Sequence, residues 1–323
     1  MATTSHPRVS VIIPVRDESR RIRQCIEGIL NQTIPIYEII VIDSGSSDGT
    51  LEILREFPEV SLIEIDGSTF NHGLTRNLGV KSSSGDFCLL TVGDAYAFNE
   101  HWVQNLLDGF IDDEVLAVCG QQVVDHLPEN NPAQWFRPQS EPSIRKLKFS
   151  AEQWRGLKPM DKKKAIGWDD VNAMYRRDAL VQSPFKKTSY SEDLIWAYDA
   201  LALGKAIAYN YEARVFHYHN ENAEFAYKRA LTACYFRYKL TGYMQEPISH
   251  IDFIQMLRWL KSILIARYFN PRTILKWMMY NINRRNATVK AIAHLNEAII
   301  NGERYLDDFH QNACGKPPIP SKK

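Results

Sequence analysis

The sequence predicts an α/β fold with a mostly parallel sheet that helices cover on both faces. Over the first 125 residues, short apolar runs alternate with amphipathic stretches. That alternation is typical of strand–helix–strand units. The runs are apolar at nearly every position, as strands buried on both faces must be. Ligands bind such sheets at the carboxyl ends of the strands, so the residues that follow each strand are the first candidates for a site.

The individual elements follow in a regular order. Strands are predicted at 9–15, 37–43, 60–65, 87–92 and 116–124, and helices at 22–30, 50–57, 74–81 and 101–110. Residues 125–164 are rich in proline and predict a long loop with short helices, the usual place for a substrate-specific insertion. A strand at 170–175, a helix at 193–203 and short strands at 206–209 and 214–216 come next, and the pattern is helical from residue 222.

The composition sets broad limits on the function. The net charge of +1 over 323 residues gives no overall field that would indicate a nucleic acid partner. The five cysteines are scattered and form no CxxC pair, which favours a reducing, cytoplasmic setting over a disulfide framework or a zinc site. We expect no signal peptide in the polar first eight residues, and no apolar run reaches the roughly 18 residues of a membrane span.

Two aspartates stand where predicted strands end. Asp43 precedes the small residues 44–50 (SGSSDGT), which allow a base or phosphate to approach the backbone, and its carboxylate can accept a hydrogen bond from a pyrimidine N–H. Asp94 leaves the fourth strand beside Gly93, where it could hold a Mg²⁺ or Mn²⁺ ion that bridges two phosphates. The alternative for both is an ordinary turn aspartate, and Asp48 is more simply a helix cap.

Further candidates lie at two helix starts and after a late strand. Residues 70–77 (FNHGLTRN) open a helix whose free N–H groups, together with Arg76, suit a pyrophosphate, although a capped surface helix explains them equally. Glu192 and Asp193 supply a candidate general base, or only favourable partners for the helix dipole. His217 and His219 could complete the shell of a metal, or be structural.

Taken in order, these pieces resemble the family 2 glycosyltransferases with the GT-A fold. The matching segments are 11–14 with Glu18, 41–50, 75–79, 84–86, Asp94, Glu192 with Asp193, and 215–217. Residues 70–77 and 217–220 most resemble bacterial rhamnosyltransferases of surface polysaccharide assembly, and the resemblance covers about residues 8–235.

The resemblance implies a GT-A-type nucleotide-binding sandwich followed by a C-terminal helical region. The catalytic domain would span 1–220, with a nucleotide-binding half at 1–125 and an acceptor-binding half at 126–220, and the helical region 221–323. It also implies an inverting displacement from a nucleotide-sugar, with proton removal from the acceptor and neutralisation of the departing diphosphate by Mn²⁺ or Mg²⁺.

The same resemblance assigns roles to single residues. The donor would contact Pro14, Arg16, Glu18, Asp43, Arg76, Gly93 and Asp94; Asp94 and His217 would ligate the metal; Asp193, with Glu192, would be catalytic; and Trp168, Asp170 and Asn172 would bind the acceptor. One departure is notable. The family usually shows two or three acids or a Gln-Asp pair at the metal strand, whereas here Val92 and Gly93 precede Asp94. The remaining metal ligands would then come from His217 and the diphosphate.

Residues 251–290 carry eight basic residues against one acid, Asp252, interleaved with aromatic and aliphatic side chains. This pattern indicates an element that lies on a membrane surface, or a helical bundle that packs on the catalytic domain or on a second subunit. No nucleic-acid-binding motif accompanies it. The expected location is cytoplasmic, with peripheral contact to the inner face of the cell membrane, and a homo-oligomer is left open.

The leading hypothesis is a glycosyltransferase that moves L-rhamnose from dTDP-L-rhamnose to a growing surface polysaccharide or a lipid-linked glycan. A UDP- or GDP-hexose donor is the alternative within that class. A non-catalytic module that binds nucleotide-sugars or glycans is the alternative from another class, motivated by the single carboxylate at the metal strand. A nicotinamide dehydrogenase is disfavoured because residues 16–18 follow the first strand without a GxGxxG motif.

Overall fold

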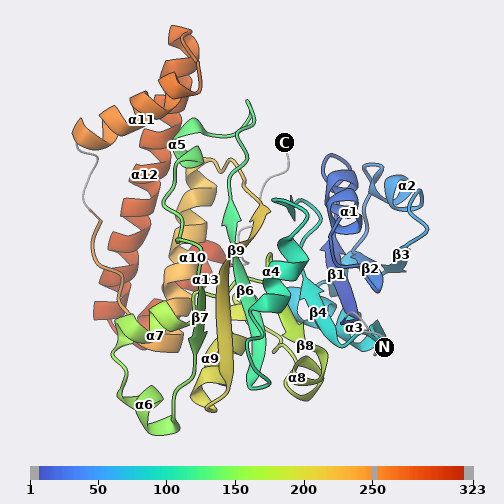
Figure 1. Ribbon diagram of the computed structural model, residues 1–323. Helices are drawn as coiled ribbons and strands as arrows, with labels where there is room; N and C mark the ends of the chain where they lie inside the picture. Colours follow the sequence, from blue (N-terminus) through green and yellow to red (C-terminus); the bar gives the residue numbers. More distant parts are fainter. Residues whose placement is uncertain (1–6, 249–252, 316–323) are drawn as a thin grey trace.

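A nine-stranded sheet forms the centre of the molecule (Figure 1). The computed structural model describes residues 7–248 and 253–315. The strands are β1 (Val9–Val15), β2 (Glu38–Asp43), β3 (Val60–Glu64), β4 (Phe87–Leu90), β5 (Tyr96–Ala97), β6 (Val115–Val123), β7 (Ile144–Leu147), β8 (Ala173–Arg176) and β9 (Ala206–Phe216). Their order is β3-β2-β1-β4-β8-β6-β9-β5, and β7 also pairs with β9.

Most of the strands run in one direction, as predicted. β1 pairs in parallel with β2 and β4, β2 with β3, and β6 with β9, whereas β5, β7 and β8 run against their neighbours. Val15 lies opposite Asp43 in the register of β1 and β2, so these two strands end together. The loops that follow them therefore meet at one edge of the sheet.

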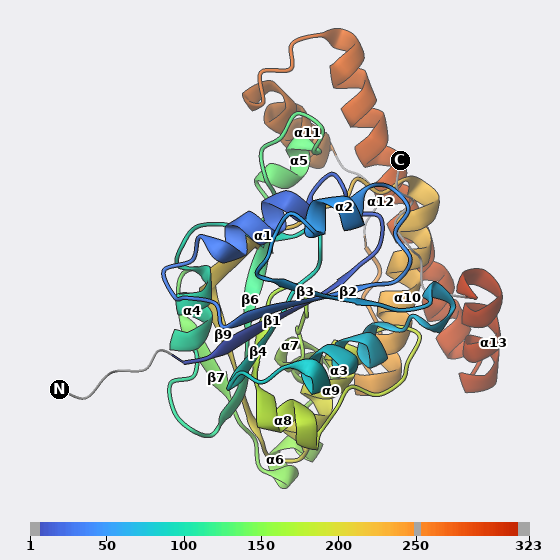
Figure 2. The ribbon, with the colours of Figure 1, turned by 90° about the vertical axis from the view of Figure 1, so that its right-hand side faces the viewer.

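Helices cover both faces of the sheet, as Figure 2 shows for α1 above the strands and α3 and α9 below them. The helices of this part are α1 (Ile22–Leu30), α2 (Thr50–Leu54), α3 (His72–Ser82), α4 (Trp102–Asp108), α5 (Pro132–Trp135), α6 (Ala151–Gly156), α7 (Pro159–Ala165), α8 (Arg177–Gln182) and α9 (Glu192–Ala202), with a 3-10 turn at Gly67–Thr69. One core cluster joins the sheet to α1 and α4, and the other joins it to α3, α8 and α9. The α/β fold class is confirmed.

The structure differs from the predicted elements at β9. The two short strands expected at 206–209 and 214–216 are one strand whose register against β6 shifts between Cys119 and Gln121. Asn172 fills this irregularity, because its side-chain amide donates to the carbonyls of Ala213 (2.8 Å) and Gln121 (3.2 Å). The strand expected at 170–175 is confined to β8, and β5, β7 and α8 were not predicted.

In the described residues after β9, the chain forms the helices α10 (Ala223–Thr241), α11 (Phe253–Ile265), α12 (Pro271–Ile300) and α13 (Glu303–Cys314). Apolar residues of α10, α12 and α13 share a third core cluster. The side-chain amides of Asn131 and Asn281, both buried, pair at 2.8 Å and attach α12 to the start of α5. None of the helices formed by residues 7–248 and 253–315 has the length and apolar character that crossing a bilayer requires.

Candidate active site

The loops after β1 and β2 are joined by hydrogen bonds between their backbones and short side chains. The backbone N–H of Asp17, which has φ of +52°, donates to Ser46 Oγ at 2.8 Å, and the Asp17 carboxylate accepts from the N–H of Ser47 at 2.8 Å. The N–H of Glu18 donates to Thr50 Oγ1 at 2.7 Å. The segment 44–50 thus fixes the loop after β1.

Asp43 is buried, and its carboxylate points toward the backbone of the loop that follows it. Its carboxylate accepts from the backbone N–H groups of Gly45 (2.8 Å) and Ser46 (3.0 Å) and from the hydroxyl of Ser46. Pro14 is buried in β1 beside it, whereas Arg16 is exposed at the mouth of the loop. The contacts predicted between these residues and a donor stay predictions.

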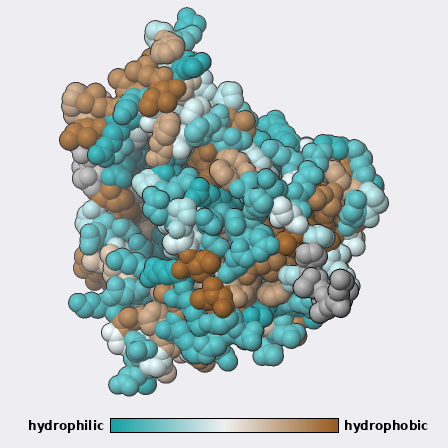
Figure 3. Space-filling model, viewed as in Figure 1, coloured by the Kyte–Doolittle hydropathy of each residue, from teal (hydrophilic) through white to brown (hydrophobic). Residues whose placement is uncertain are grey.

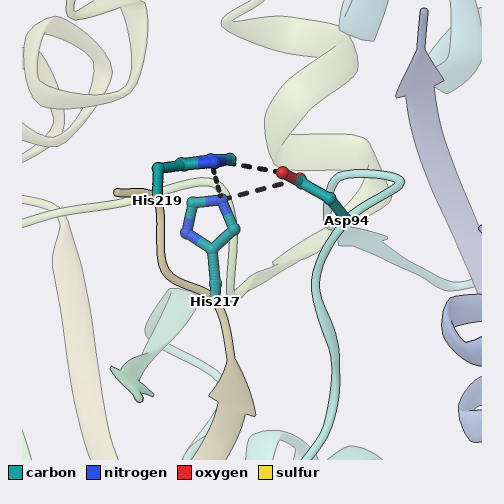
Figure 4. A group of neighbouring side chains, drawn as sticks. All are labelled: Asp94, His217 and His219. Atoms are coloured by element: carbon teal, nitrogen blue, oxygen red, sulfur yellow. Dashed lines mark hydrogen bonds and ion pairs between the residues drawn. The ribbon is translucent and has the colours of Figure 1, made fainter. Parts of the chain in front are cut away.

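Asp94, His217 and His219 form a compact group at the ends of two loops (Figure 4). The Nε2 atoms of the two histidines lie 3.0 Å apart, and they lie 3.6 Å (His217) and 3.2 Å (His219) from the carboxylate of Asp94. All three side chains are partly exposed, with 17% of Asp94 accessible. One carboxylate and two imidazole nitrogens directed at a common point are a donor set that suits a divalent metal ion.

A hydrogen bond to Gln122 fixes the orientation of the His217 ring. Gln122 must donate its amide hydrogen to the carboxylate of Asp169, which can only accept. The Gln122 oxygen therefore faces Nδ1 of His217, 2.8 Å away, and accepts a hydrogen bond from it. The lone pair of His217 is then on Nε2, which points toward Asp94 and His219, as a metal ligand requires.

Electrostatics couple the three members of the group. Burial alone would raise the pKa of Asp94, but His217 and His219 in their protonated forms lower it well below its ordinary value, His217 through a hydrogen bond and both through their charge. Burial alone would lower the pKa of His217, yet Asp94 raises it. The carboxylate is therefore ionised, and a metal cation would bind there as the two histidines release their protons.

Gly93 explains why a second acid does not precede Asp94. A Cβ atom at this position would lie 2.9 Å from Cγ1 of Val15 and 3.0 Å from Cγ of Glu18, so the side chain of Glu18 occupies the space of the one that is missing. Glu18 thereby packs against Gly93, the residue before Asp94, which the sequence pattern alone did not indicate.

A second group of charged residues consists of Arg76 and the acids around it. Arg76 is 4% exposed and pairs with Glu192, and its Nε lies 3.8 Å from the carboxylate of Asp170. Asp170 is fully buried, accepts a hydrogen bond from the hydroxyl of Tyr175, and its backbone N–H approaches Asp193 at 3.4 Å. The single guanidinium of Arg76 thus lies close to the carboxylates of both Glu192 and Asp170.

This excess of negative charge raises the pKa of two acids. Burial, followed by the charges of Glu192, Asp170 and Asp169, raises the pKa of Asp193 well above its ordinary value. Burial also raises the pKa of Asp170 to about 7, although Arg76 opposes the shift. Of the two, Asp193 is the accessible one, because Asp170 is fully buried. A partly exposed carboxyl with a raised pKa has the properties of a general base.

The segment 70–77 holds the loop that carries these acids. Asn71 caps α3 by accepting from the N–H of Leu74 at 3.1 Å and donates to the carbonyl of Thr188 at 2.7 Å. Asn77 exchanges hydrogen bonds with the backbone of Phe185. In this structure the N-terminus of α3 and Arg76 therefore position residues 185–192, and donor contact by Arg76 stays a prediction.

The predicted acceptor residues are buried. Trp168 donates from Nε1 to the hydroxyl of Tyr175 at 2.6 Å, and Asn172 accepts from Nε1 of Trp102 at 2.8 Å. Trp168, Asp170 and Asn172 are each at most 2% exposed. These three residues pack in the protein interior next to the acid group. Direct contact between them and an acceptor stays a prediction.

Sequence reasoning left several contributors outside the predicted metal and catalytic sets. His219, which the sequence offered only through its spacing of two residues from His217, completes the candidate metal-binding group. Gln122 and Asp169 join the candidate metal-binding group to the acid group. Asp169 lies between the predicted acceptor residues Trp168 and Asp170, whereas nothing in the sequence pattern marked Gln122. A cavity of about 1030 Å³ between α8 and α9 includes none of these residues.

Comparison with known proteins identifies the family of the chain. The chain matches the glycosyl transferase family 2 profile over residues 10–182. The O-antigen chain rhamnosyltransferase RfbN of Salmonella typhimurium is 33% identical over 218 residues, which are 66% of this chain and 67% of that protein. The O-antigen chain rhamnosyltransferase WbaN of Salmonella anatum is 31% identical over 224 residues, again 66% and 67% of the two chains.

Solved structures show the same fold at low sequence identity. The mannosyltransferase PcManGT from Pyrobaculum calidifontis, in complex with GDP-Man and Mn²⁺, has a TM-score of 0.52 at 18% identity and covers 96% of this chain and 80% of its own. TarS 1–349 of S. aureus, in complex with UDP-GlcNAc, has a TM-score of 0.52 at 14% identity and covers 92% of each chain. The fold is therefore of the GT-A type, and the chain belongs to glycosyl transferase family 2 and is a glycosyltransferase related to the O-antigen rhamnosyltransferases.

Proposed function

We propose that the chain transfers L-rhamnose from dTDP-L-rhamnose to a hydroxyl group of a growing bacterial surface polysaccharide or lipid-linked glycan. The observation that carries the reaction type is the metal-binding group of Asp94, His217 and His219, which Gln122 and Asp169 connect to the acids around Asp193. The similarity to the two O-antigen rhamnosyltransferases supports rhamnose as the sugar.

In the proposed reaction, Asp193 accepts the proton of the acceptor hydroxyl as its oxygen attacks the anomeric carbon. The bond from that carbon to the diphosphate breaks, and dTDP leaves with the electron pair on the opposite face, which inverts the configuration. Because an approaching substrate excludes water, a carboxylate held near other carboxylates becomes a stronger base. Glu192, paired with Arg76, holds the start of α9 in place.

Asp94, His217 and His219 are the residues that would hold Mn²⁺ or Mg²⁺. A divalent ion there would neutralise charge on the departing diphosphate. The chain supplies one carboxylate and two neutral imidazoles, and imidazole suits Mn²⁺ better than Mg²⁺, which prefers oxygen ligands. We therefore propose Mn²⁺ as the more effective ion.

Donor contacts are proposed at the edge where β1 and β2 end together. Asp43 would bind the base, and Arg16 and Glu18 would line the adjoining loop. The catalytic domain that contains these residues would end near residue 220. The tight turn of residues 44–50 supports this proposal, because small side chains leave the backbone accessible to a base.

A thermal-shift screen tests the donor. Protein is melted with dTDP-L-rhamnose, UDP-hexoses and GDP-mannose, each with and without Mn²⁺. A ligand that binds only the folded state at 100 times its Kd adds about 2.7 kcal/mol of stability. We expect the largest shift with dTDP-L-rhamnose plus Mn²⁺, and a reduced shift in Asp94→Asn. A larger shift with a UDP- or GDP-sugar would overturn the donor assignment while leaving the enzyme class intact.

A further inference from the structure

The outward face of α11 is apolar. Phe253, Ile254, Leu257, Leu264 and Ile265 are all exposed, with Phe253 71% accessible. Their spacing of three, four and seven residues puts them on one side of the helix. A surface helix normally turns charged and polar residues outward, so this face is the reverse of the usual arrangement.

The opposite side of α11 packs against the rest of the protein. Trp259 and Ile263 are buried, and α11 contacts α5 and α12. Figure 3 shows the apolar residues gathered at the upper left, over α11, at the periphery of the molecule. Among the described residues, nothing covers the outward face.

The exposed apolar surface continues through the link after α11 into the first turns of α12. Phe269 is 68% and Leu275 62% exposed. We call these residues, with the five of α11, the α11–α12 patch. A soluble monomer rarely leaves so many neighbouring large apolar side chains accessible without a partner.

The segment that carries the patch is also strongly basic. Residues 253–290 hold eight basic residues and no aspartate or glutamate, in a chain whose net charge is only +1. The basic residues are Arg258, Lys261, Arg267, Arg272, Lys276, Arg284, Arg285 and Lys290. Arg258 and Lys261 lie on the exposed side of α11, and neither forms an ion pair with an acid in the described part of the chain. Their long stems can lie along apolar surface while the charged ends reach outward.

We infer that the α11–α12 patch docks on an anionic membrane surface. Apolar side chains would enter the boundary between headgroups and acyl chains, and the cations would pair with lipid phosphates, which is how interfacial helices bind. A second copy of this chain fits less well, because a two-fold contact would place one basic patch against another. This inference goes beyond the proposed function and does not depend on the donor.

The patch is tied to the loops of the candidate active site. The hydroxyl of Tyr268 donates to the carbonyl of Pro128 at 2.9 Å, and Asn220 donates to the carbonyl of Glu129 at 2.6 Å. The N–H of Glu221 donates to the hydroxyl of Tyr280 at 2.8 Å. Docking through the patch would therefore hold the loop of His217 and His219 at the membrane-facing end of the enzyme.

Vesicle co-sedimentation of the full chain tests the inference. We expect binding to phosphatidylcholine vesicles that contain phosphatidylglycerol, little binding to phosphatidylcholine alone, and weaker binding at high salt. Each surface cation contributes about 1 kcal/mol, or about fivefold, so Arg258→Gln with Lys261→Gln should weaken binding by about 25-fold. Leu257→Ser with Ile265→Ser should weaken it on both lipid mixtures.

A matched control removes an exposed apolar residue and a cation elsewhere. Leu203→Ser with Lys205→Gln lies beyond the end of α9, and Leu203 is 73% exposed. This variant should bind vesicles as the wild type does, and all variants should melt at the same temperature. Equal binding of the patch variants and the control would overturn the inference. So would light scattering that shows a wild-type dimer which the patch variants convert to monomers.

Discussion

The side-chain oxygen of Gln122 lies 2.8 Å from Nδ1 of His217, while the amide nitrogen of the same side chain donates to Asp169. One residue in the last part of β6 thereby sets the tautomer of a candidate metal ligand and connects it to the acids that surround Asp193. The connection is specific, because exchanging the oxygen and nitrogen of Gln122 would leave two acceptors, the Gln122 oxygen and the carboxylate of Asp169, facing each other.

Replacing Gln122 by leucine should weaken metal binding without unfolding the protein. Loss of a partner that orients a histidine ligand commonly costs 10- to 100-fold in metal affinity, and we expect at least about tenfold here. Titration calorimetry with Mn²⁺ measures the affinity, and sugar transfer should recover at higher Mn²⁺. Gln182→Leu, at the end of α8 and exposed, is the control and should leave the Mn²⁺ titration unchanged. An unchanged titration in Gln122→Leu would show that the glutamine does not position His217.

Asp193→Asn should remove the base and spare the donor site. The amide preserves the size of the side chain but cannot accept the acceptor's proton, so turnover should fall by about 10² to 10⁴-fold. Donor-induced thermal shifts should stay within error of the wild type. Asp199→Asn, on the same helix but paired with Lys186 at the surface, is the control. Full turnover by Asp193→Asn would require another base, and loss of the donor shift would mean that the residue acts in binding instead.

Asp170 should make the protein less stable as the pH rises from about 4 to about 7. Its pKa is raised from 3.8 to about 7 by burial, so in this range the folded state keeps a proton that the unfolded state has lost. Unfolding then releases a proton, and the free energy of unfolding falls with rising pH by up to about 1.4 kcal/mol per unit. Below the unfolded pKa both states hold the proton, and above about 7 neither does.

The contribution of Asp170 is isolated by comparison with Asp170→Asn. The amide oxygen can still accept from Tyr175, so the variant should match the wild type near pH 4 and become the more stable protein near pH 7. Urea unfolding at a series of pH values measures the difference. Parallel curves for the two proteins would mean that Arg76 keeps Asp170 ionised in the folded state.

The sequence pattern was sufficient for the sheet and for residues that end strands. The apolar runs at β1, β2 and β4 are buried along almost their whole length, and such runs are readable without a structure. β9 was divided in the prediction because the polar residues Asn210 and Glu212 interrupt it. Its continuity depends on Asn172, which lies far away in sequence and supplies the hydrogen bonds that the shifted register lacks.

The candidate site was predictable where a residue type is itself a signal, and only there. Asp94 and His217 could be proposed as ligands because carboxylates and histidines after strands are common metal ligands. Gln122 could not, since an amide in mid-strand has no distinctive pattern and gains its role from contacts across the sheet. The pairing of Arg76 with Glu192 could not be predicted either, because the two residues are 116 positions apart in the sequence.

Gly93 should tolerate no side chain, although the family commonly has an acid there. In Gly93→Ala the new Cβ would lie 2.9 Å from Val15, which is buried in the core, and 3.0 Å from Glu18. Overpacking of this kind costs about 1 to 3 kcal/mol. Displacement of the adjacent Asp94 should also weaken Mn²⁺ binding. Gly156→Ala is the control, because nothing lies within 4 Å of a Cβ at that position, and it should leave the free energy of unfolding unchanged or slightly higher. If Gly93→Ala unfolds at the same urea concentration as the wild type and binds Mn²⁺ equally well, the loop of Glu18 yields readily, and the absence of a second acid beside Asp94 has no packing cause.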